Sequence, residues 1–163
     1  MSLLYLPEHA QAMLKSLELG HKEADHLRYS QATLFALAID VSWVEALSSQ
    51  PVLAEKVEAF VSRFGRLQDH IGGKLLPRYA ALVGESAKSQ LDTLAFAERV
   101  GLLTDADAFI AARGLRNALV HEYMHDPHIF LENLLAANPA CALFLKTIDC
   151  IDKELRRLGL ISS

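Results

Sequence analysis

Residues 52–83, VLAEKVEAFVSRFGRLQDHIGGKLLPRYAALV, decide the fold class because their apolar side chains recur at helical spacing. The apolar positions that share one stripe of this segment are Phe60, Phe64, Leu67, Ile71, Leu75 and Leu82. Steps of three, four and seven residues are typical of an amphipathic helix that buries one face. Gly72-Gly73 and Pro77 predict a bend or a break within this helix.

The rest of the chain also carries helix signals, and it has no alternating β-branched run and no Asn-Gly or Asp-Gly hairpin turn. Further helices are predicted over residues 7–19, 26–47 and 91–100. Another is predicted from a cap at Thr104-Asp105 to near His125. Two more are predicted to start at Asp126-Pro127 and at Asn138-Pro139, and the last of them to end at Gly159. The sequence therefore predicts an all-α protein, a compact bundle of about six or seven helices that forms a single domain over residues 1–163.

The bulk composition restricts the class of protein. Hydrophobic residues make up 52% of the chain and charged residues 22%, which is enough to bury a core. The net charge of −4 does not favour general nucleic-acid binding, so an RNA partner needs a local basic surface. The longest apolar run, residues 32–39, is too short to span a membrane, and the N-terminus lacks the features of a secretory signal. No membrane partner is therefore expected. Cys141 and Cys150 fall on opposite sides of one helix, which predicts free thiols in the cytoplasm.

Residues 116–123, RNALVHEY, group several chemically useful side chains on one predicted helix. Arg116 and Tyr123 lie nearly in line two turns apart, while Asn117 and His121 share a neighbouring face. Arg116 and His121 are offset by roughly 140°, at about 100° per residue. Arginine's length, a distortion near Gly114 or a symmetric dimer are the ways in which these two side chains can converge.

These residue types meet the requirements of metal-independent RNA cleavage. A histidine such as His121 can take and give protons near neutral pH, and the arginine Arg116 can hold a phosphate with two hydrogen bonds. Asn117 can orient the reacting group. One histidine is too few to serve as both acid and base, so a second copy of the chain at a two-fold interface would complete the site.

The segment 116–123 matches an R-x4-H-x-Y pattern, and in this respect the chain resembles the HEPN superfamily, in its HepT-like branch. Asn117 directly after the arginine fits that pattern, as do the flanking residues 101–105, GLLTD, and Asp126-Pro127. The resemblance is specific over residues 98–135 and looser over residues 53–85.

The resemblance implies a homodimeric helical bundle that acts as a metal-independent endoribonuclease toxin without a cofactor. It implies that Arg116 and His121 are catalytic, that Asn117 supports them, and that RNA is the substrate. It also implies a minimal nucleotidyltransferase antitoxin that adds AMP to Tyr123. An alternative within the same family is a non-catalytic protein that binds a nucleotidyltransferase partner or a nucleotide.

Two other interpretations of this segment remain open. His121, Glu122 and His125 form an H-E-x-x-H pattern, with His128 as a further candidate ligand, which is typical of zinc peptidases. Pro127 disfavours helical geometry at the residue before it, so the helix is expected to end at the second histidine. A purely structural interpretation has Arg116 pairing with a surface carboxylate, His121 as an ordinary histidine and Tyr123 as a core ring.

A second group of basic residues shares one face of the segment 52–83 if the helix continues through its glycines. This basic stripe consists of Arg63, Arg66, His70, Lys74 and Arg78. Together with Arg113, the cations of this stripe are candidate contacts for an RNA backbone or a partner protein, and a plain solvated face is the alternative. Three other histidines, His9, His21 and His26, have no partner at recognisable spacing and are expected at the surface.

Overall fold

The computed structural model of the chain describes residues 4–122 and 125–162. Its α-helices are α1 (Ala10–Leu34), α2 (Val41–Glu45), α3 (Pro51–His70), α4 (Leu76–Leu82), α5 (Gln90–Arg99), α6 (Ala106–Glu122) and α7 (Pro127–Arg157). Two short 3-10 turns, η1 (Pro7–His9) and η2 (Ala46–Ser49), and a π-helical turn, η3 (Ile71–Leu75), complete the elements. No strand occurs in either described range, which confirms the all-α prediction.

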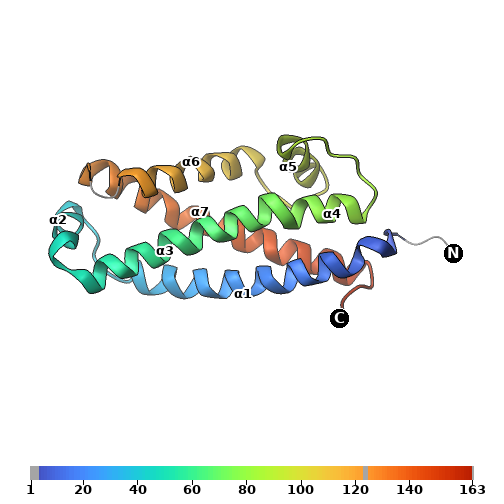
Figure 1. Cartoon of the computed structure of the whole chain (residues 1–163), viewed down its shortest axis with the longest axis horizontal. Coiled ribbons are helices and arrows are strands. Elements are labelled where there is room, and N and C mark those ends of the chain that lie inside the picture. Colours follow the sequence, from blue (N-terminus) through green and yellow to red (C-terminus); the bar gives the residue numbers. More distant parts are fainter. Residues whose placement is uncertain (1–3, 123–124, 163) are drawn as a thin grey trace.

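Four long helical segments run along the length of the molecule and alternate in direction (Figure 1). They are α1, the continuous segment formed by α3, η3 and α4, then α6, and finally α7. Helix α5 packs beside α4 at one end, and α2 lies at the other end against α7. The prediction of a helical bundle with short connections is confirmed, and the structure adds that the bundle is of the up-and-down type.

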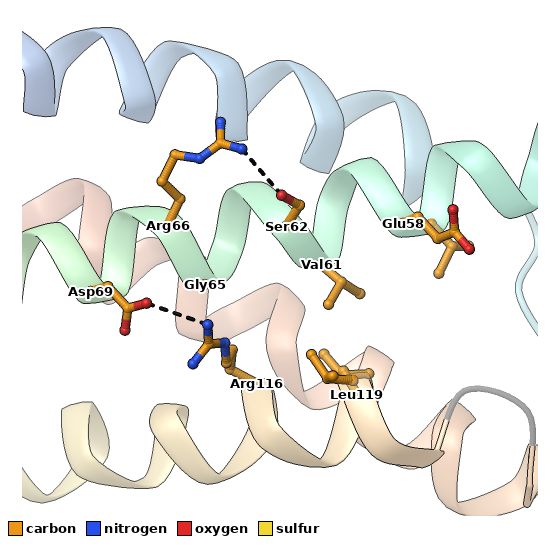
Figure 2. A pocket seen from close by; sticks show the side chains of 10 residues that line it. Glu58, Val61, Ser62, Gly65, Arg66, Asp69, Arg116 and Leu119 are labelled. Carbon is orange, nitrogen blue, oxygen red and sulfur yellow. Dashed lines mark hydrogen bonds and ion pairs between the residues drawn. The ribbon is translucent and has the colours of Figure 1, made fainter.

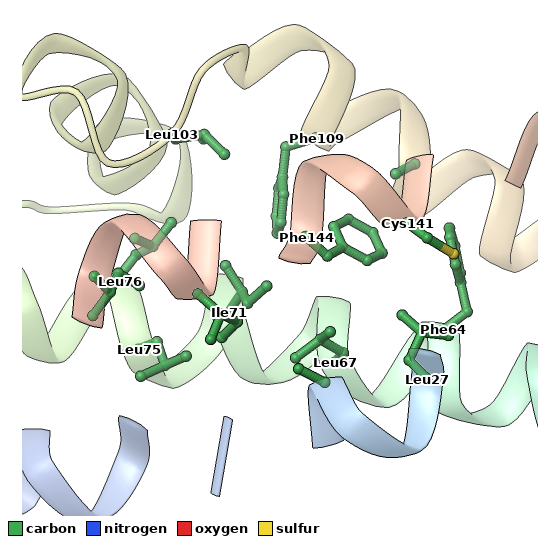
Figure 3. Close-up of a cluster of buried hydrophobic side chains, with 14 of the residues drawn as sticks. Leu27, Phe64, Leu67, Ile71, Leu75, Leu76, Leu103, Phe109, Cys141 and Phe144 are labelled. Atoms are coloured by element: carbon green, nitrogen blue, oxygen red, sulfur yellow. The ribbon is translucent and has the colours of Figure 1, made fainter. Parts of the chain in front are cut away.

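The core is centred on a row of phenylalanine rings from α3, α6 and α7 (Figure 3). The ring centroids of Phe60 and Phe64 lie 5.9 Å apart. Phe144 follows at 4.9 Å from Phe64, and Phe109 lies 5.7 Å from Phe144. All four rings are at most 1% exposed. The row therefore joins three of the long segments through contacts that stabilise beyond the area they bury.

A single helix, α1, replaces the two helices that the sequence predicts over 7–19 and 26–47. The helix continues through Gly20, because this glycine is a packing position and not a break. A Cβ at Gly20 would lie 3.1 Å from side-chain carbons of Leu75 and Ile148, so the missing side chain lets α1 approach η3 and α7 closely. The predicted division of this region is therefore wrong, since tertiary packing overrides the weak helix propensity of glycine.

The predicted helix over 26–47 is also wrong beyond Leu34, where α1 ends. Asp40 has an extended backbone, and its side chain accepts a hydrogen bond from the N–H of Trp43 at 2.8 Å. An aspartate in this position satisfies a free N–H of the first turn and starts a new helix. The chain therefore turns between α1 and α2.

The segment that decided the fold class remains helical through Gly72, Gly73 and Pro77, so the chain does not break there. Instead, the helix widens into η3, where the N–H of Leu76 donates to the carbonyl of Ile71, five residues back. The wider turn comes just before Pro77, which has no N–H and whose ring crowds the carbonyl four residues earlier in a regular helix. The glycines and the proline thus distort the helix without ending it.

Pro139 lies inside α7, so the helix start predicted at Asn138-Pro139 is wrong. The side-chain oxygen of Asn138 accepts a hydrogen bond from Gln31 of α1 at 2.8 Å. Ala137 and Cys141, on either side of the proline, are fully buried. Burial of both flanks holds the helix together against a penalty of about 3 kcal/mol for an internal proline.

Both ends of α7 agree with the predictions. The Asp126 side chain accepts hydrogen bonds from the N–H groups of His128 at 3.0 Å and Ile129 at 3.3 Å, and Pro127 is the first helical residue. At the other end, Gly159 has a φ of +81°, a conformation that favours glycine and ends helices.

Candidate functional site

Helix α6 carries the first part of the R-x4-H-x-Y segment. Asp105 starts the helix by accepting a hydrogen bond from the N–H of Ala108 at 2.9 Å, as the sequence predicts. The buried face of α6 is formed by Phe109, Ala112 and Leu119, each 1% exposed. This face packs against α3 and α7, and α6 stays α-helical through Gly114. The packing of α6 therefore fixes where Arg116 emerges.

Arg116 reaches across a groove between α6 and α3 (Figure 2). Its guanidinium forms an ion pair with Asp69 of α3, with 3.4 Å between the nitrogen and the carboxylate oxygen. The stem of Arg116 passes over Gly65, where a Cβ would lie 2.9 Å from its Nε and 3.0 Å from its Cγ. The side chain of Arg116 remains 38% exposed and that of Asp69 55% exposed. Pairing with a surface carboxylate is what the purely structural interpretation predicts, yet the guanidinium stays accessible from the groove.

The groove has a volume of about 570 Å³, within the range of small-molecule sites. Its apolar lining consists of Val57, Val61, Leu119 and Val120, and its polar lining includes Glu58, Ser62 and Arg66. Figure 2 shows Asp69 and Arg116 toward one end of the groove and Glu58 toward the other. A guanidinium beside an apolar wall suits a phosphate that carries a flat or apolar group.

The structure describes the other residues of the motif only in part. Asn117 is exposed on α6, on a face next to that of Arg116. The backbone of His121 belongs to α6, about 140° around the helix from Arg116 by helical geometry. The side chain of His121 and the whole of Tyr123 lie outside the described residues. The structure therefore places the cation of the predicted site and leaves its pairing with the imidazole undescribed.

The zinc-peptidase interpretation requires two histidines on one helix. The described part of α6 reaches Glu122, and His125 lies beyond it. Among the described side chains, which do not include those of His121 and Glu122, no group of three or more histidine, cysteine, aspartate or glutamate residues is arranged to hold a metal ion.

Three members of the basic stripe form hydrogen bonds to α1, and one of them, Arg78, remains exposed. Arg63 donates a hydrogen bond to the Ser30 hydroxyl of α1 at 2.7 Å. The ring of His70 is buried, with Nε2 2.7 Å from the carbonyl oxygen of Ser16. Arg78 donates to the hydroxyl of the same serine. These side chains therefore hold the segment from α3 to α4 against α1, which sequence spacing alone did not predict.

The other predicted cations lie at the surface. Arg66 and Lys74 are exposed, and Arg66 donates to the Ser62 hydroxyl at 3.3 Å. Arg113 is exposed on α6 and donates to the Gln90 side-chain oxygen at the start of α5. Of the stripe, the exposed cations Arg66, Lys74 and Arg78 remain the candidates for contact with an anionic partner.

A carboxyl group of α1 faces the stripe. Burial raises the pKa of Glu23 above its ordinary value, while His70, Arg66, Lys74 and His26 act in the opposite direction. One carboxyl oxygen of Glu23 is shielded from solvent. The positive charge of the stripe is thus partly balanced within the protein, and this carboxyl was not among the residues that the sequence singled out.

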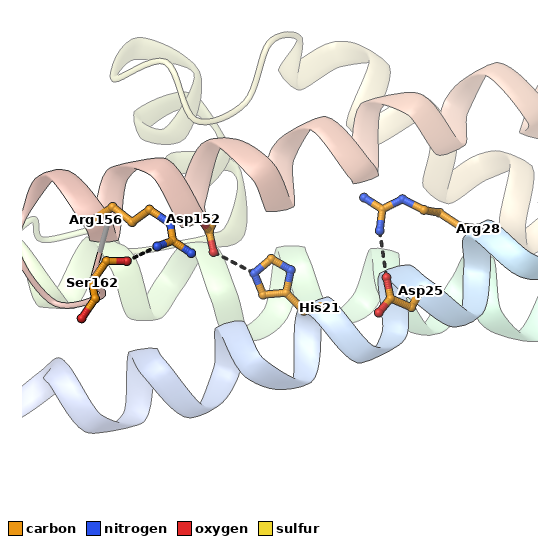
Figure 4. A network of polar contacts seen from close by, with 6 residues as sticks. All are labelled: His21, Asp25, Arg28, Asp152, Arg156 and Ser162. Atoms are coloured by element: carbon orange, nitrogen blue, oxygen red, sulfur yellow. Dashed lines mark hydrogen bonds and ion pairs between the residues drawn. The ribbon is translucent and has the colours of Figure 1, made fainter.

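A second polar cluster joins α1 to α7 (Figure 4). The ring of His21 lies 2.9 Å from a carboxylate oxygen of Asp152, and the Arg156 Nε donates to the other oxygen at 2.6 Å. Burial raises the pKa of Asp152, but the hydrogen bonds from Arg156 and His21 outweigh it, so the pKa is lowered. The partner of His21 lies 131 residues away in the chain, so no spacing in the sequence indicates it, and the side chain of His21 is 42% exposed, in agreement with the surface position expected for it.

A third cluster joins α4 to α7. The Tyr79 hydroxyl donates to a carboxylate oxygen of Glu154, and the Arg157 Nε donates to the other oxygen at 2.6 Å. The hydrogen bond from Arg157 is the main reason that the pKa of Glu154 is lowered, and burial opposes it. Burial, followed by the hydrogen bond to Glu154, raises the pKa of Tyr79 far above its usual range.

Helix α7 also carries both cysteines and a long apolar stretch. Cys141 and Cys150 are free thiols, as predicted, and burial raises the pKa of Cys141 to about 12. By length and composition alone, α7 is apolar enough to cross a membrane, and 39% of its most apolar window is buried inside the bundle. Core helices of soluble proteins share this length and composition.

No model of a known protein family matches this chain, and no curated protein or solved structure does.

Proposed function

We propose that this chain is a HEPN-type, metal-independent endoribonuclease toxin that works as a homodimer in the cytoplasm. Its antitoxin would be a minimal nucleotidyltransferase that adds AMP to Tyr123. The observation that carries the proposal is the position of Arg116, whose guanidinium lies at an open groove on the helix that also carries the backbone of His121. The resemblance of residues 116–123 to the R-x4-H-x-Y motif supplies the reaction.

In this proposal Arg116 binds the scissile phosphate and balances the negative charge that develops on it. His121 accepts the proton of the ribose 2′-hydroxyl as that oxygen attacks phosphorus. The bond to the 5′-oxygen breaks, and a second imidazole donates a proton to this leaving group. The products are a 2′,3′-cyclic phosphate and a 5′-hydroxyl end. Asn117, exposed next to Arg116, orients the phosphate or the imidazole.

The second imidazole comes from a symmetric copy of the chain. Two exposed apolar side chains on α6, Ile110 and Val120, are 42% and 56% exposed and lie near the motif. Covering such side chains in a two-fold interface favours association and brings the two motif helices together. The free thiols of Cys141 and Cys150 agree with a cytoplasmic protein, and no membrane is involved in the proposal.

The test uses the full chain with single-stranded RNA in EDTA. We expect cleavage that leaves 2′,3′-cyclic phosphate ends. Arg116→Ala should reduce the rate by about 100-fold or more, the effect of losing one preorganised donor, and His121→Ala should reduce it at least as much. Thermal unfolding of both variants should match that of the unchanged protein. Lys88→Ala is the control, because it removes an exposed cation that does not line the groove, and it should cut RNA at nearly the normal rate.

A second candidate is a non-catalytic HEPN protein that binds a nucleotidyltransferase or a nucleotide. The ion pair between Arg116 and Asp69 favours it, because part of the guanidinium's charge is already balanced. Absence of cleavage, together with stable binding of a minimal nucleotidyltransferase encoded next to this chain, would replace the first proposal by the second.

A further inference from the structure

We infer that Asp69 is a positioning residue that holds Arg116 in the free protein and competes with a substrate phosphate for its guanidinium. This inference rests on the proposed function, since it concerns the same site. Asp69 is contributed by α3, outside the R-x4-H-x-Y segment, and it forms the ion pair that the structure records for Arg116. The two residues meet only because α3 and α6 pack side by side.

The geometry of the pair is that of a loose contact. The 3.4 Å between nitrogen and oxygen is longer than the 2.7–2.9 Å of a charge-assisted hydrogen bond. Arginine has five N–H donors, and a single contact to Asp69 leaves most of them unused. Both side chains are more than a third exposed, and exposed ion pairs are weak. A phosphate that offers two oxygens can therefore replace or share this contact.

The aliphatic stem of Arg116 packs more closely against α3 than its guanidinium does. Since a Cβ at Gly65 would come within 3.0 Å of both Nε and Cγ of Arg116, the stem lies directly over the backbone of α3. Asp69 is one helical turn further along the same face of α3. Gly65 thus sets the path of the side chain, and Asp69 sets the direction in which the guanidinium points. Substrate binding needs only a small rotation at the end of the side chain.

Competition and positioning have opposite effects on binding and turnover. Without the carboxylate, the guanidinium is free to pair with phosphate, so binding tightens. The guanidinium then also samples directions that do not fit the transition state, so turnover falls. Replacing a residue with a purely structural role would instead weaken binding and turnover together and also lower the stability of the fold.

The experiment compares Asp69→Asn, Asp69→Glu and Glu55→Gln. Glu55 is exposed on the same helix outside the lining of the groove, and its variant changes the net charge by the same amount as Asp69→Asn. Binding is measured with a single-stranded 2′-O-methyl oligoribonucleotide, which lacks the attacking hydroxyl, at one fixed salt concentration. Turnover is measured with the unmodified oligonucleotide, and thermal unfolding reports on the fold.

We expect Asp69→Asn to bind the methylated oligonucleotide about three- to five-fold more tightly, the size of effect that losing an exposed ion pair allows. Its kcat should fall about ten-fold. Asp69→Glu should restore kcat toward the normal value, and Glu55→Gln should change either quantity less than about two-fold.

The inference is overturned if Asp69→Asn behaves like Glu55→Gln, if it weakens binding, or if the unchanged protein does not bind the methylated oligonucleotide. The proposed function fails separately. If the unmodified RNA is not cut but Asp69→Asn still binds more tightly, only the nuclease proposal is lost. If RNA is cut and Asp69 has no effect, only the present inference is lost.

Discussion

At the scale of single residues, the missing side chain of Gly65 matters as much as the charge of Arg116. The arginine stem takes the space that any other residue would fill. Neither Gly65 nor Asp69 was predicted from the sequence, because nothing in the spacing of residues 52–83 shows which turn of that helix will face α6. The sequence identified Arg116 as the cation of the site, whereas the residues of α3 that position its side chain depend on tertiary packing.

Gly65→Ala is therefore expected to displace Arg116 while leaving the fold intact. A Cβ at 2.9 Å from Nε forces the flexible arginine to move, and a shift of about 1 Å in a catalytic group reduces rates by up to roughly 100-fold. RNA cleavage and thermal unfolding are the measurements. Gly73→Ala is the matched control, because no heavy atom lies within 4 Å of a Cβ there, and it should keep full activity. Equal activity of the two variants would show that the close approach of the Arg116 side chain to Gly65 has no role in cleavage.

At the scale of helices, the sequence predicted those ends that have a local cause. Asp126 and Pro127 start α7 because a capping side chain and a proline act within one turn. The same pairing at Asn138 and Pro139 predicted a start that does not occur. The difference lies in the neighbours, since Asn138 binds Gln31 of another helix and the flanking residues are buried. A local signal therefore fails where long-range contacts are stronger.

The contact between α4 and α7 has a predictable pH dependence. Because the pKa of Glu154 is lowered in the folded protein, its contribution is present above the ordinary value of 4.5 and is lost as the pH falls through the folded value. We expect Glu154→Gln to reduce the free energy of unfolding by about 1–2 kcal/mol near neutral pH, the loss of hydrogen bonds to a charged group. The difference should shrink below about pH 4.

Tyr79→Phe gives an independent measure of the same contact. The raised pKa of Tyr79 means that its contribution is present below the ordinary value of 10.0 and is lost only in stronger alkali. Urea unfolding curves for the Tyr79 and Glu154 variants, recorded from acid to weakly alkaline pH, separate the two effects. A difference for Tyr79→Phe that vanishes at neutral pH would contradict the hydrogen bond to Glu154.

At the scale of the whole molecule, the bundle depends on the phenylalanine row that joins α3, α6 and α7. Phe144→Ala removes a fully buried ring that contacts Phe64 and Phe109. We expect a loss of about 3–5 kcal/mol, a large part of the roughly 5–15 kcal/mol that stabilises a typical domain. Leu135→Ala on the same helix, where the leucine is 46% exposed, should change stability by less than about 0.5 kcal/mol. Denaturant unfolding of both variants tests this, and similar losses would show that the row is not central.

The architecture itself was predictable because periodic apolar residues and short connections leave few ways to bury every helix. The pairing of particular helices was not. Contacts such as that between His21 and Asp152 join distant parts of the chain, and no spacing within one segment indicates them.

The π-helical turn η3 has a consequence for changes in chain length. Its hydrogen bond spans one residue more than those of α3 and α4, so it acts as a one-residue insertion in the continuous helical segment that these helices form. Deleting Gly73 together with Pro77→Ala should turn η3 into a regular α-helical turn and keep every side chain of α3 and α4 in its present register. Deleting Ser62 within α3 would instead rotate all later residues of this segment by about 100° and expose its apolar face. Only the first deletion should yield a protein that unfolds cooperatively on heating.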